Sequence, residues 1–444
     1  MDVIPMRSNE ATLPASPLRV SADKPNFAGL DALRCFAALG VVLLHSCVPY
    51  LRYPMPGLTW SVMDTPNTAI DFLFWSIELF IMPLFLVLAG FFAWQTLQRR
   101  GPNILIRGRA RRLLIPLLFG AIVILPLDLY CWVGSWVAEG IVSPAKLKSL
   151  KLDHPIGQNL WGLSHLWFLQ YLFLYVACLA TFAIAAKRYP WIKEYQPSLK
   201  TSLSLTVMAA TLILCIEPQV VWGFQHSFLP VPSKWLYSGI FFTLGLMLAI
   251  HDPKLLWVKS YAPRLAAPAL ITCMLALLLG RWQLEQWVSA PTETRQSAFS
   301  LAGILLAALT AGSALLTTLS LIGLSLKLIP TVPNSVRYLA AASFWIYIVH
   351  HPILGLTHLD LKLLLPQFSP IVKMTLSFAT ACCLSLLTYE AVVRTTRLGQ
   401  LLGFQWKPAT DDREMKQEQP ILSISSAESP QPIAQPAAAS RRAA

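Results

Sequence analysis

Two ionisable residues enclose an apolar segment near the start of the chain. Residues 34–45 read RCFAALGVVLLH, so Arg34 and His45 stand at the two ends of a run that is almost entirely apolar. In a helix, eleven steps make about three full turns and advance about 16 Å, which places both side chains on nearly the same face. An arginine can bind anions, and a histidine can exchange protons near neutral pH. The pair predicts anion binding at one end of the segment and proton transfer at the other.

Two carboxylates also fall inside apolar segments. Glu78 and Asp128 are each surrounded in sequence by aliphatic and aromatic residues. Burying a charged side chain in a membrane costs several kcal/mol unless it is paired, so such residues are candidates for function. Either carboxylate could orient His45 by fixing its tautomer, or could be a structural partner of Arg34 or of a histidine. The sequence leaves both alternatives open.

The composition identifies an integral membrane protein. Of 444 residues, 55% are hydrophobic and 13% are charged, and this charged fraction is about half that of an ordinary soluble domain. No apolar core with a small-residue cleavage site precedes Phe27, so we predict no cleaved signal peptide. The eight cysteines lie in apolar stretches without metal-ligand spacing, which predicts neither a disulfide nor a metal site.

The apolar segments predict an all-α, polytopic membrane helical bundle of about ten transmembrane helices. The expected spans are residues 27–48, 70–97, 113–137, 163–186, 201–217, 235–250, 264–280, 298–326, 338–356 and 370–393. Residues 27–394 form the predicted transmembrane domain. The polar and Pro-rich composition predicts largely disordered tails at residues 1–26 and 395–444.

The distribution of Lys and Arg between the spans predicts the orientation. The loops after the second, fourth, sixth and eighth spans are the richest in Lys and Arg, as in RGRARR at residues 107–112. By the positive-inside rule both termini are cytoplasmic. This topology explains the net charge of +13 without a nucleic-acid partner. Most of the histidines then fall on the outer side.

An ordered series of motifs resembles the acyltransferase 3 family of integral membrane O-acyltransferases. The motifs are LDALRCFAALGVVLLH, PLFLVLAGFF, RARRLLIP, SHLWFL, ASFWIYIVHHPI and YEAVVR. They extend from about Leu30 to Arg394 and are most similar to the glucans biosynthesis protein C branch, which is associated with succinylation of periplasmic glucans. The resemblance therefore makes residues 27–394 a transmembrane acyltransferase domain.

The resemblance carries over to individual residues. Matching positions are Arg34 with His45, Arg109 with Arg112 before Ile115 and Pro116, His165 with Trp167, and His350 with His351. Two departures stand out. Ala89 occupies a position where the family usually has Ser, and residues 81–83 replace polar residues of the branch with Ile-Met-Pro. These departures leave the substrate open.

The resemblance implies transfer of an acyl group, succinyl in this branch, from cytoplasmic acyl-CoA to a hydroxyl of a periplasmic or envelope glycan such as an osmoregulated glucan. Catalytic roles then fall to His45, as general base or transient acyl carrier, to Arg34, at the thioester oxygen or along the donor path, and to Glu78, as the orienting carboxylate. Arg109 and Arg112 would hold the donor phosphates. Substrate binding is expected of His165, Trp167, His350 and His351.

Acyl-CoA is expected as a donor substrate, with no bound cofactor. The expected partners are the donor, the glycan acceptor, membrane lipids and the glucan-synthesis machinery. A transporter of an acylated or sugar-like solute is the main alternative, because intramembrane Arg, Glu and His are equally expected there. Many transporters contain paired repeats with interrupted helices, and we find no such repeat in this sequence. A structural membrane partner would leave the outer histidines unexplained.

Overall fold

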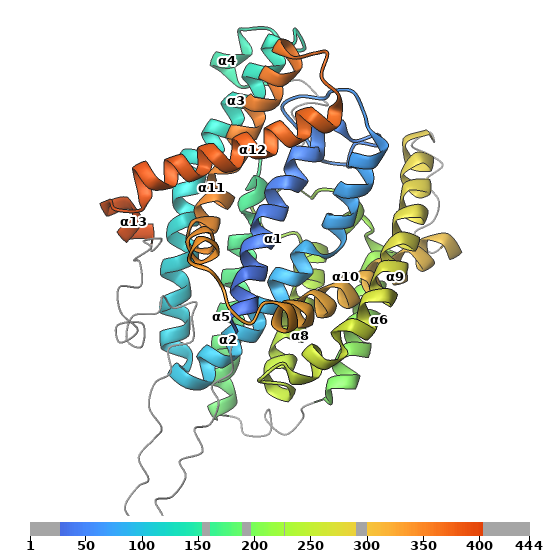
Figure 1. The fold of residues 1–444 in the computed structure, drawn as a ribbon, viewed down its shortest axis with the longest axis vertical. Helices are drawn as coiled ribbons and strands as arrows, with labels where there is room; N and C mark the ends of the chain where they lie inside the picture. The colour runs from blue at the N-terminus through green and yellow to red at the C-terminus, as the bar shows by residue number, and fades with distance from the viewer. Residues whose placement is uncertain (1–26, 153–159, 189–196, 226, 290–299, 403–444) are drawn as a thin grey trace, which may run out of the picture.

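A computed structural model describes residues 27–152, 160–188, 197–225, 227–289 and 300–402. Within these ranges the chain is helical and contains no strand (Figure 1), which confirms the predicted all-α membrane bundle. The predicted tail at residues 1–26 and most of the tail at 395–444 lie outside the described residues. Residues 397–402 of the second tail form a short helix.

The helices follow one another in a simple order. They are α1 (Ala28–Cys47), α2 (Thr68–Phe119), α3 (Leu125–Ala138), α4 (Lys146–Ser149), α5 (Trp167–Arg188), α6 (Leu199–Ile216), α7 (Gln219–Trp222), α8 (Pro232–His251), α9 (Leu256–Ser289), α10 (Leu301–Leu328), α11 (Asn334–Leu364), α12 (Pro370–Thr388) and α13 (Arg397–Leu402). A π-helical turn, Gly120–Ile124, joins α2 to α3, and a 3₁₀ turn, Ser164–Leu166, precedes α5.

Nine helical stretches of the described residues are long and apolar enough to cross a membrane. One of them, Thr68–Ala138, has 71 residues and contains two of the expected spans, 70–97 and 113–137. Gly101 interrupts it with φ 77° and ψ 172°, and Pro102 follows. Glycine adopts a positive φ without steric cost, and proline fits the start of the next helix. The chain therefore turns back at Gly101 (Figure 1), so that this stretch supplies two of the expected spans.

Polar side chains mark where several helices begin. The Asn67 side chain accepts hydrogen bonds from the backbone N–H groups of Ala69 and Ile70 at the start of α2. Serines do the same at the starts of α6, α10 and α12, namely Ser198, Ser300 and Ser369. These caps satisfy backbone donors that a helix leaves free at its N-terminus. They fall near the predicted span boundaries because each stands at the edge of an apolar run.

Helix α1 lies inside the bundle, in contact with α2, α10, α11 and α12. Close backbone packing holds α2 against α8. A Cβ added to Gly90 would lie 2.0 Å from the Phe242 carbonyl oxygen, and one added to Gly245 would lie 2.1 Å from the Val87 oxygen. Small residues allow such approach in membranes, where packing drives helix association. This contact brings the faces of α2 and α8 together around the site.

The segment between α1 and α2 packs against α12. Asp64 in this segment pairs with Lys373 of α12 at 2.9 Å, and both side chains are buried. Burial raises the pKa of Asp64, but hydrogen bonds from Lys373 and Thr65 outweigh it and leave the pKa below its ordinary value. The pair therefore anchors the segment to α12.

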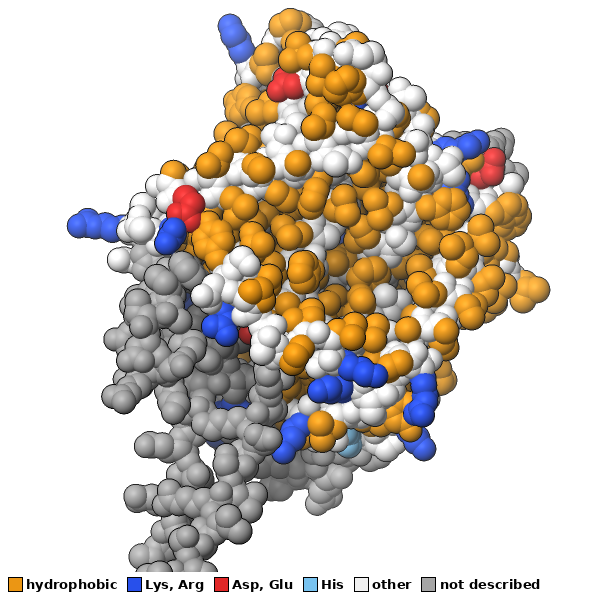
Figure 2. Space-filling view, viewed as in Figure 1, with side chains coloured by type: hydrophobic (Ala, Val, Ile, Leu, Met, Phe, Trp, Pro, Cys, Tyr) orange, Lys and Arg blue, Asp and Glu red, His pale blue; other side chains and the backbone are white. Residues whose placement is uncertain are grey.

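The surface fits a lipid environment. A broad hydrophobic band crosses the face seen in Figure 2, and Lys and Arg side chains gather mainly below it. The eight cysteines all lie within the described residues and are all free. Six of them are buried or partly buried, whereas Cys178 and Cys383 are exposed. The hydrophobic band agrees with a multi-pass arrangement.

Candidate active site

Helices α1 and α11 bring two histidines into contact. The Nδ1 atom of His45 lies 2.8 Å from the Nε2 atom of His350, and the two rings stack with centroids 5.1 Å apart. Trp60, from the segment before α2, stacks near His45 with a centroid distance of 5.9 Å. His350 is fully buried behind His45. The His45 ring is therefore held between the rings of Trp60 and His350.

The hydrogen bonds assign the tautomers of both rings. His350 Nδ1 lies 2.8 Å from the carbonyl oxygen of Tyr347, and a carbonyl can only accept, so this nitrogen carries the proton. Neutral His350 then has a lone pair on Nε2 and accepts a hydrogen bond from His45 Nδ1–H. The remaining lone pair of His45 is on Nε2, which has no hydrogen bond among the described residues. His45 is thus arranged as a base whose reactive nitrogen is Nε2.

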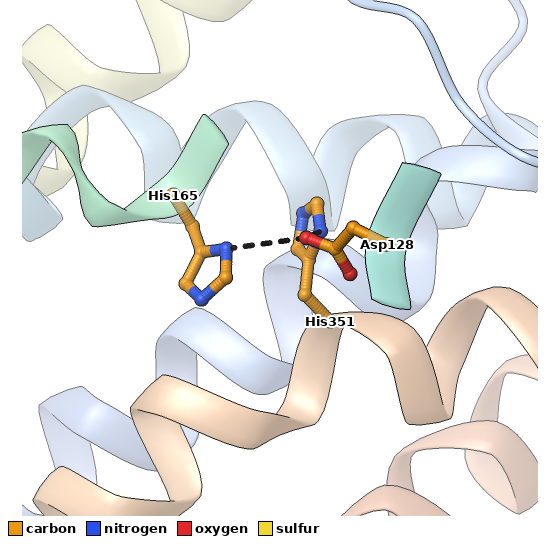
Figure 3. A group of neighbouring side chains, drawn as sticks. All are labelled: Asp128, His165 and His351. Carbon is orange, nitrogen blue, oxygen red and sulfur yellow. Dashed lines mark hydrogen bonds and ion pairs between the residues drawn. The ribbon is translucent and has the colours of Figure 1, made fainter. Parts of the chain in front are cut away.

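A second group of ionisable side chains adjoins this pair. Asp128 of α3, His165 of the 3₁₀ turn and His351 of α11 lie together (Figure 3), and each is about 5% exposed. His351 Nδ1 lies 3.0 Å from Asp128 Oδ2, and His165 Nδ1 lies 3.9 Å from the same oxygen. His165 Nε2 donates to the Ile348 carbonyl at 3.1 Å, which leaves its Nδ1 as an acceptor in the neutral ring.

This carboxylate and its two imidazoles can do two kinds of chemistry. Asp128 fixes the tautomer of His351 by accepting from Nδ1–H, as a carboxylate does for a catalytic histidine. The three ligand atoms also lie within 4.8 Å of one another, a set that could hold a divalent transition metal. No metal site was predicted from the sequence, because the three residues stand far apart in the chain and show no ligand spacing.

The two groups form one continuous array of rings. The His351 ring meets His45 edge-on at 5.0 Å and stacks on Trp132 at 5.0 Å. His165 meets His350 at 5.1 Å. A change in the position or charge of one ring therefore alters the environment of the neighbouring rings.

A cavity of about 450 Å³ opens beside this array. Its wall includes His45, Asp128, His165 and His351, together with Glu78, Trp167 and Lys234 from α2, α5 and α8. Most of the remaining lining is apolar or aromatic, as is usual for small-molecule sites. The cavity therefore places a candidate base, His45, beside a largely apolar space that could hold a ligand.

The predicted arginines lie elsewhere. Arg34 pairs with Asp31 at 3.3 Å and lies close enough to Arg109 and Arg112 for their charges to interact. None of the three arginines lines the cavity. They form an inner arginine cluster of Arg34, Arg109 and Arg112, which α1 connects to the histidines.

The structure brings most of the predicted residues together. His45, His165, Trp167, His350 and His351 meet at the cavity or directly behind it. Glu78 lines the cavity as well, but the partner of the His45 ring nitrogen is His350. The orienting group at His45 is therefore a neutral imidazole.

Sequence reasoning missed several site residues. Trp60 and Trp132 resemble ordinary interfacial aromatics in sequence, although their rings pack on His45 and His351. Tyr347 and Ser164, which also line the cavity, were not predicted either. Lys234 carried a signal, because it is a lysine at the start of the apolar run KWLYSGIFF.

A family model described as an acyltransferase domain, Acyl_transf_3, matches residues 27–390. The chain belongs to the acyltransferase 3 family. Every candidate residue named above falls within the match, and this acyltransferase is a multi-pass membrane enzyme that transfers groups other than amino-acyl groups. Searches of curated proteins and of solved structures gave no match.

Proposed function

We propose that this acyltransferase moves an acyl group from cytoplasmic acyl-CoA to a hydroxyl of an envelope glycan on the opposite side of the membrane. The observation that carries the proposal is the Nε2 atom of His45, which has no hydrogen bond among the described residues and lies at a cavity beside His350. An osmoregulated glucan is the acceptor that the motif resemblance favours. The distribution of Lys and Arg supports cytoplasmic termini in a bacterial inner membrane.

The proposed reaction needs one proton shuttle. His45 Nε2 takes the proton of the acceptor hydroxyl as its oxygen attacks the thioester carbonyl carbon. The tetrahedral intermediate then collapses, the carbon–sulfur bond breaks, and the leaving thiolate takes the proton from the imidazolium of His45. The Nδ1–H bond to His350 persists throughout. A positioned base of this kind contributes about 10²–10⁴-fold in rate.

The inner arginine cluster supports a cytoplasmic donor site. An acyl-CoA carries several phosphates, and guanidinium groups bind phosphate through charge-assisted, often bidentate, hydrogen bonds. Arg109 and Arg112 stand three residues apart within the helical arm after Gly101, so they share a face. Arg34, about 16 Å from His45 along α1, lines the donor path in this proposal.

Acylation from labelled acyl-CoA to purified glucan tests the proposal. We expect His45→Gln to lose acylation by at least about 10²-fold per folded molecule, because glutamine preserves hydrogen bonding but cannot accept the proton. His251→Gln is the matched control, since His251 is exposed and bonds only to the Pro197 carbonyl. Wild-type activity in His45→Gln would refute the assignment. Movement of an unmodified solute without a covalent product would instead indicate a transporter.

A further inference from the structure

One buried cation faces the cavity outside the histidine array. Lys234, in the first turn of α8, is 7% exposed and lines the cavity. Its Nζ atom lies 3.8 Å from the ring centroid of Trp167 and 4.8 Å from that of Phe224. The two aromatic faces stabilise the ammonium group from one side.

The hydrogen-bonding capacity of this ammonium group is unused. A lysine has three N–H donors, and Nζ of Lys234 makes no hydrogen bond or ion pair with the described residues. Burial of an unpaired charge is costly, and an ionisable residue inside a membrane protein is functional by default. The remaining donors are available to a molecule in the cavity.

The two carboxylates near the cavity do not occupy these donors. Asp128 is engaged by His351 at 3.0 Å. Glu78 lies close enough for its charge to interact with that of Lys234, but no ion pair within 4.0 Å joins them. A carboxylate of a bound substrate could therefore approach Lys234 directly.

The position of Lys234 relates it to the reaction. Trp167, under the ammonium group, follows His165 by two residues at the start of α5. Lys234 of α8 and His45 of α1 both line this cavity. A short substrate group held by Lys234 at its charged end would extend toward the histidines.

We propose that Lys234 binds an anionic group of a substrate, a carboxylate carried either by the acyl group or by the acceptor. This inference rests on the proposed acyl transfer and names a specificity-determining residue for it. In the first case the enzyme selects acyl groups that end in a carboxylate. In the second it selects anionic glycans.

Matched substrates separate the two sources. The full chain in detergent or liposomes is assayed with succinyl-CoA and butyryl-CoA, which have equal acyl length but a charged or neutral end. Each donor is tested with a neutral glucan and with a carboxylate-bearing glucan. We expect wild-type kcat/KM to be at least about tenfold higher for the pairs that carry the recognised carboxylate, the value of one charge-assisted hydrogen bond.

Substitution of the lysine assigns the preference to this residue. Lys234→Met should remove the preference mainly by raising KM for the charged substrate, while transfer between neutral substrates persists. Lys234→Arg should keep part of the preference. Lys259→Met, at an exposed position of α9, is the control and should leave both the charge preference and the KM values unchanged.

Three results have distinct meanings. A wild-type enzyme that transfers acyl groups without any charge preference overturns the inference, even if no variant folds. Equal losses for all substrate pairs in folded Lys234→Met overturn it as well, because they indicate a structural role. A wild-type enzyme that transfers neither acyl group refutes the proposed function instead.

Discussion

In the proposed mechanism, the residue that orients His45 is itself a neutral histidine. In many catalytic sites a carboxylate takes this position and stabilises the imidazolium that forms. Here His350 is anchored by the Tyr347 carbonyl and offers only a lone pair to His45. Its contribution is therefore the tautomer and the ring orientation, with less stabilisation of positive charge than a carboxylate would give.

Removal of this lone pair should impair turnover without affecting donor binding. We expect His350→Phe to lower kcat by about 10–100-fold, the usual effect of losing an orienting partner. His350→Gln should recover part of the loss, because its side-chain oxygen can accept from His45 Nδ1–H. Steady-state kinetics normalised to folded protein provide the measurement. Equal losses in both variants would argue for a packing role alone.

Substitutions of Arg109 test whether the inner arginine cluster binds the donor. We expect Arg109→Ala to raise the KM for acyl-CoA by about 10–100-fold, since a hydrogen bond to a charged group is worth about 1.5–3 kcal/mol. Arg109→Lys should rescue only partly if the contact is bidentate. Arg107→Ala, at an exposed position of the same arm, is the control. Unchanged donor binding in correctly inserted Arg109→Ala would exclude a donor-site role.

The candidate site residues could be predicted from the sequence better than their contacts with one another. His45, His165, His350 and His351 were all candidates, because each lies in a motif that resembles the family. The partner of His45 was not predictable, since His350 is 305 positions away and the contact depends on how α11 packs on α1. Asp128 was assigned to either of two roles for the same reason. Tertiary packing, which no local sequence pattern encodes, places His351 beside Asp128.

At the element scale, Gly101 controls the reversal of the chain between two spans. An alanine there must adopt φ near 77° although open space surrounds the position, so the cost is purely conformational. We expect Gly101→Ala to lower the free energy of unfolding by about 1 kcal/mol or more. Gly108→Ala, in the helical arm that follows, also meets open space and should be neutral or slightly stabilising. Thermal unfolding in detergent measures both, and equal effects would contradict this explanation.

Span prediction succeeded because apolar length is a local property. The expected segments 201–217 and 235–250 correspond within a few residues to α6 and α8. Length alone could not show that 70–97 and 113–137 lie in one helical stretch that turns at a single glycine. Nor could it show that α9 extends well beyond residues 264–280.

At the scale of the whole molecule, the sidedness of the bundle is the testable property. We expect single cysteines at Thr59 and Lys148 to react with an impermeant reagent added outside, and cysteines at Arg107 and Lys254 to react only from the cytoplasmic side. The assay uses a background in which the native cysteines are replaced. Labelling of positions 107 and 148 from the same side would overturn the proposed orientation.

The separation of Arg34 and His45 along α1 has a consequence for the direction of acyl transfer. Arg34 and His45 are separated by about 16 Å along one helix, so the proposed reaction releases its two products into different compartments. Free CoA returns to the metabolic pool that supplied it, whereas the ester accumulates where no CoA is present to reverse the transfer. In this proposal acyl groups would cross the membrane in one direction only, because cleavage of the thioester drives the transfer. No separate carrier would be needed to move them across.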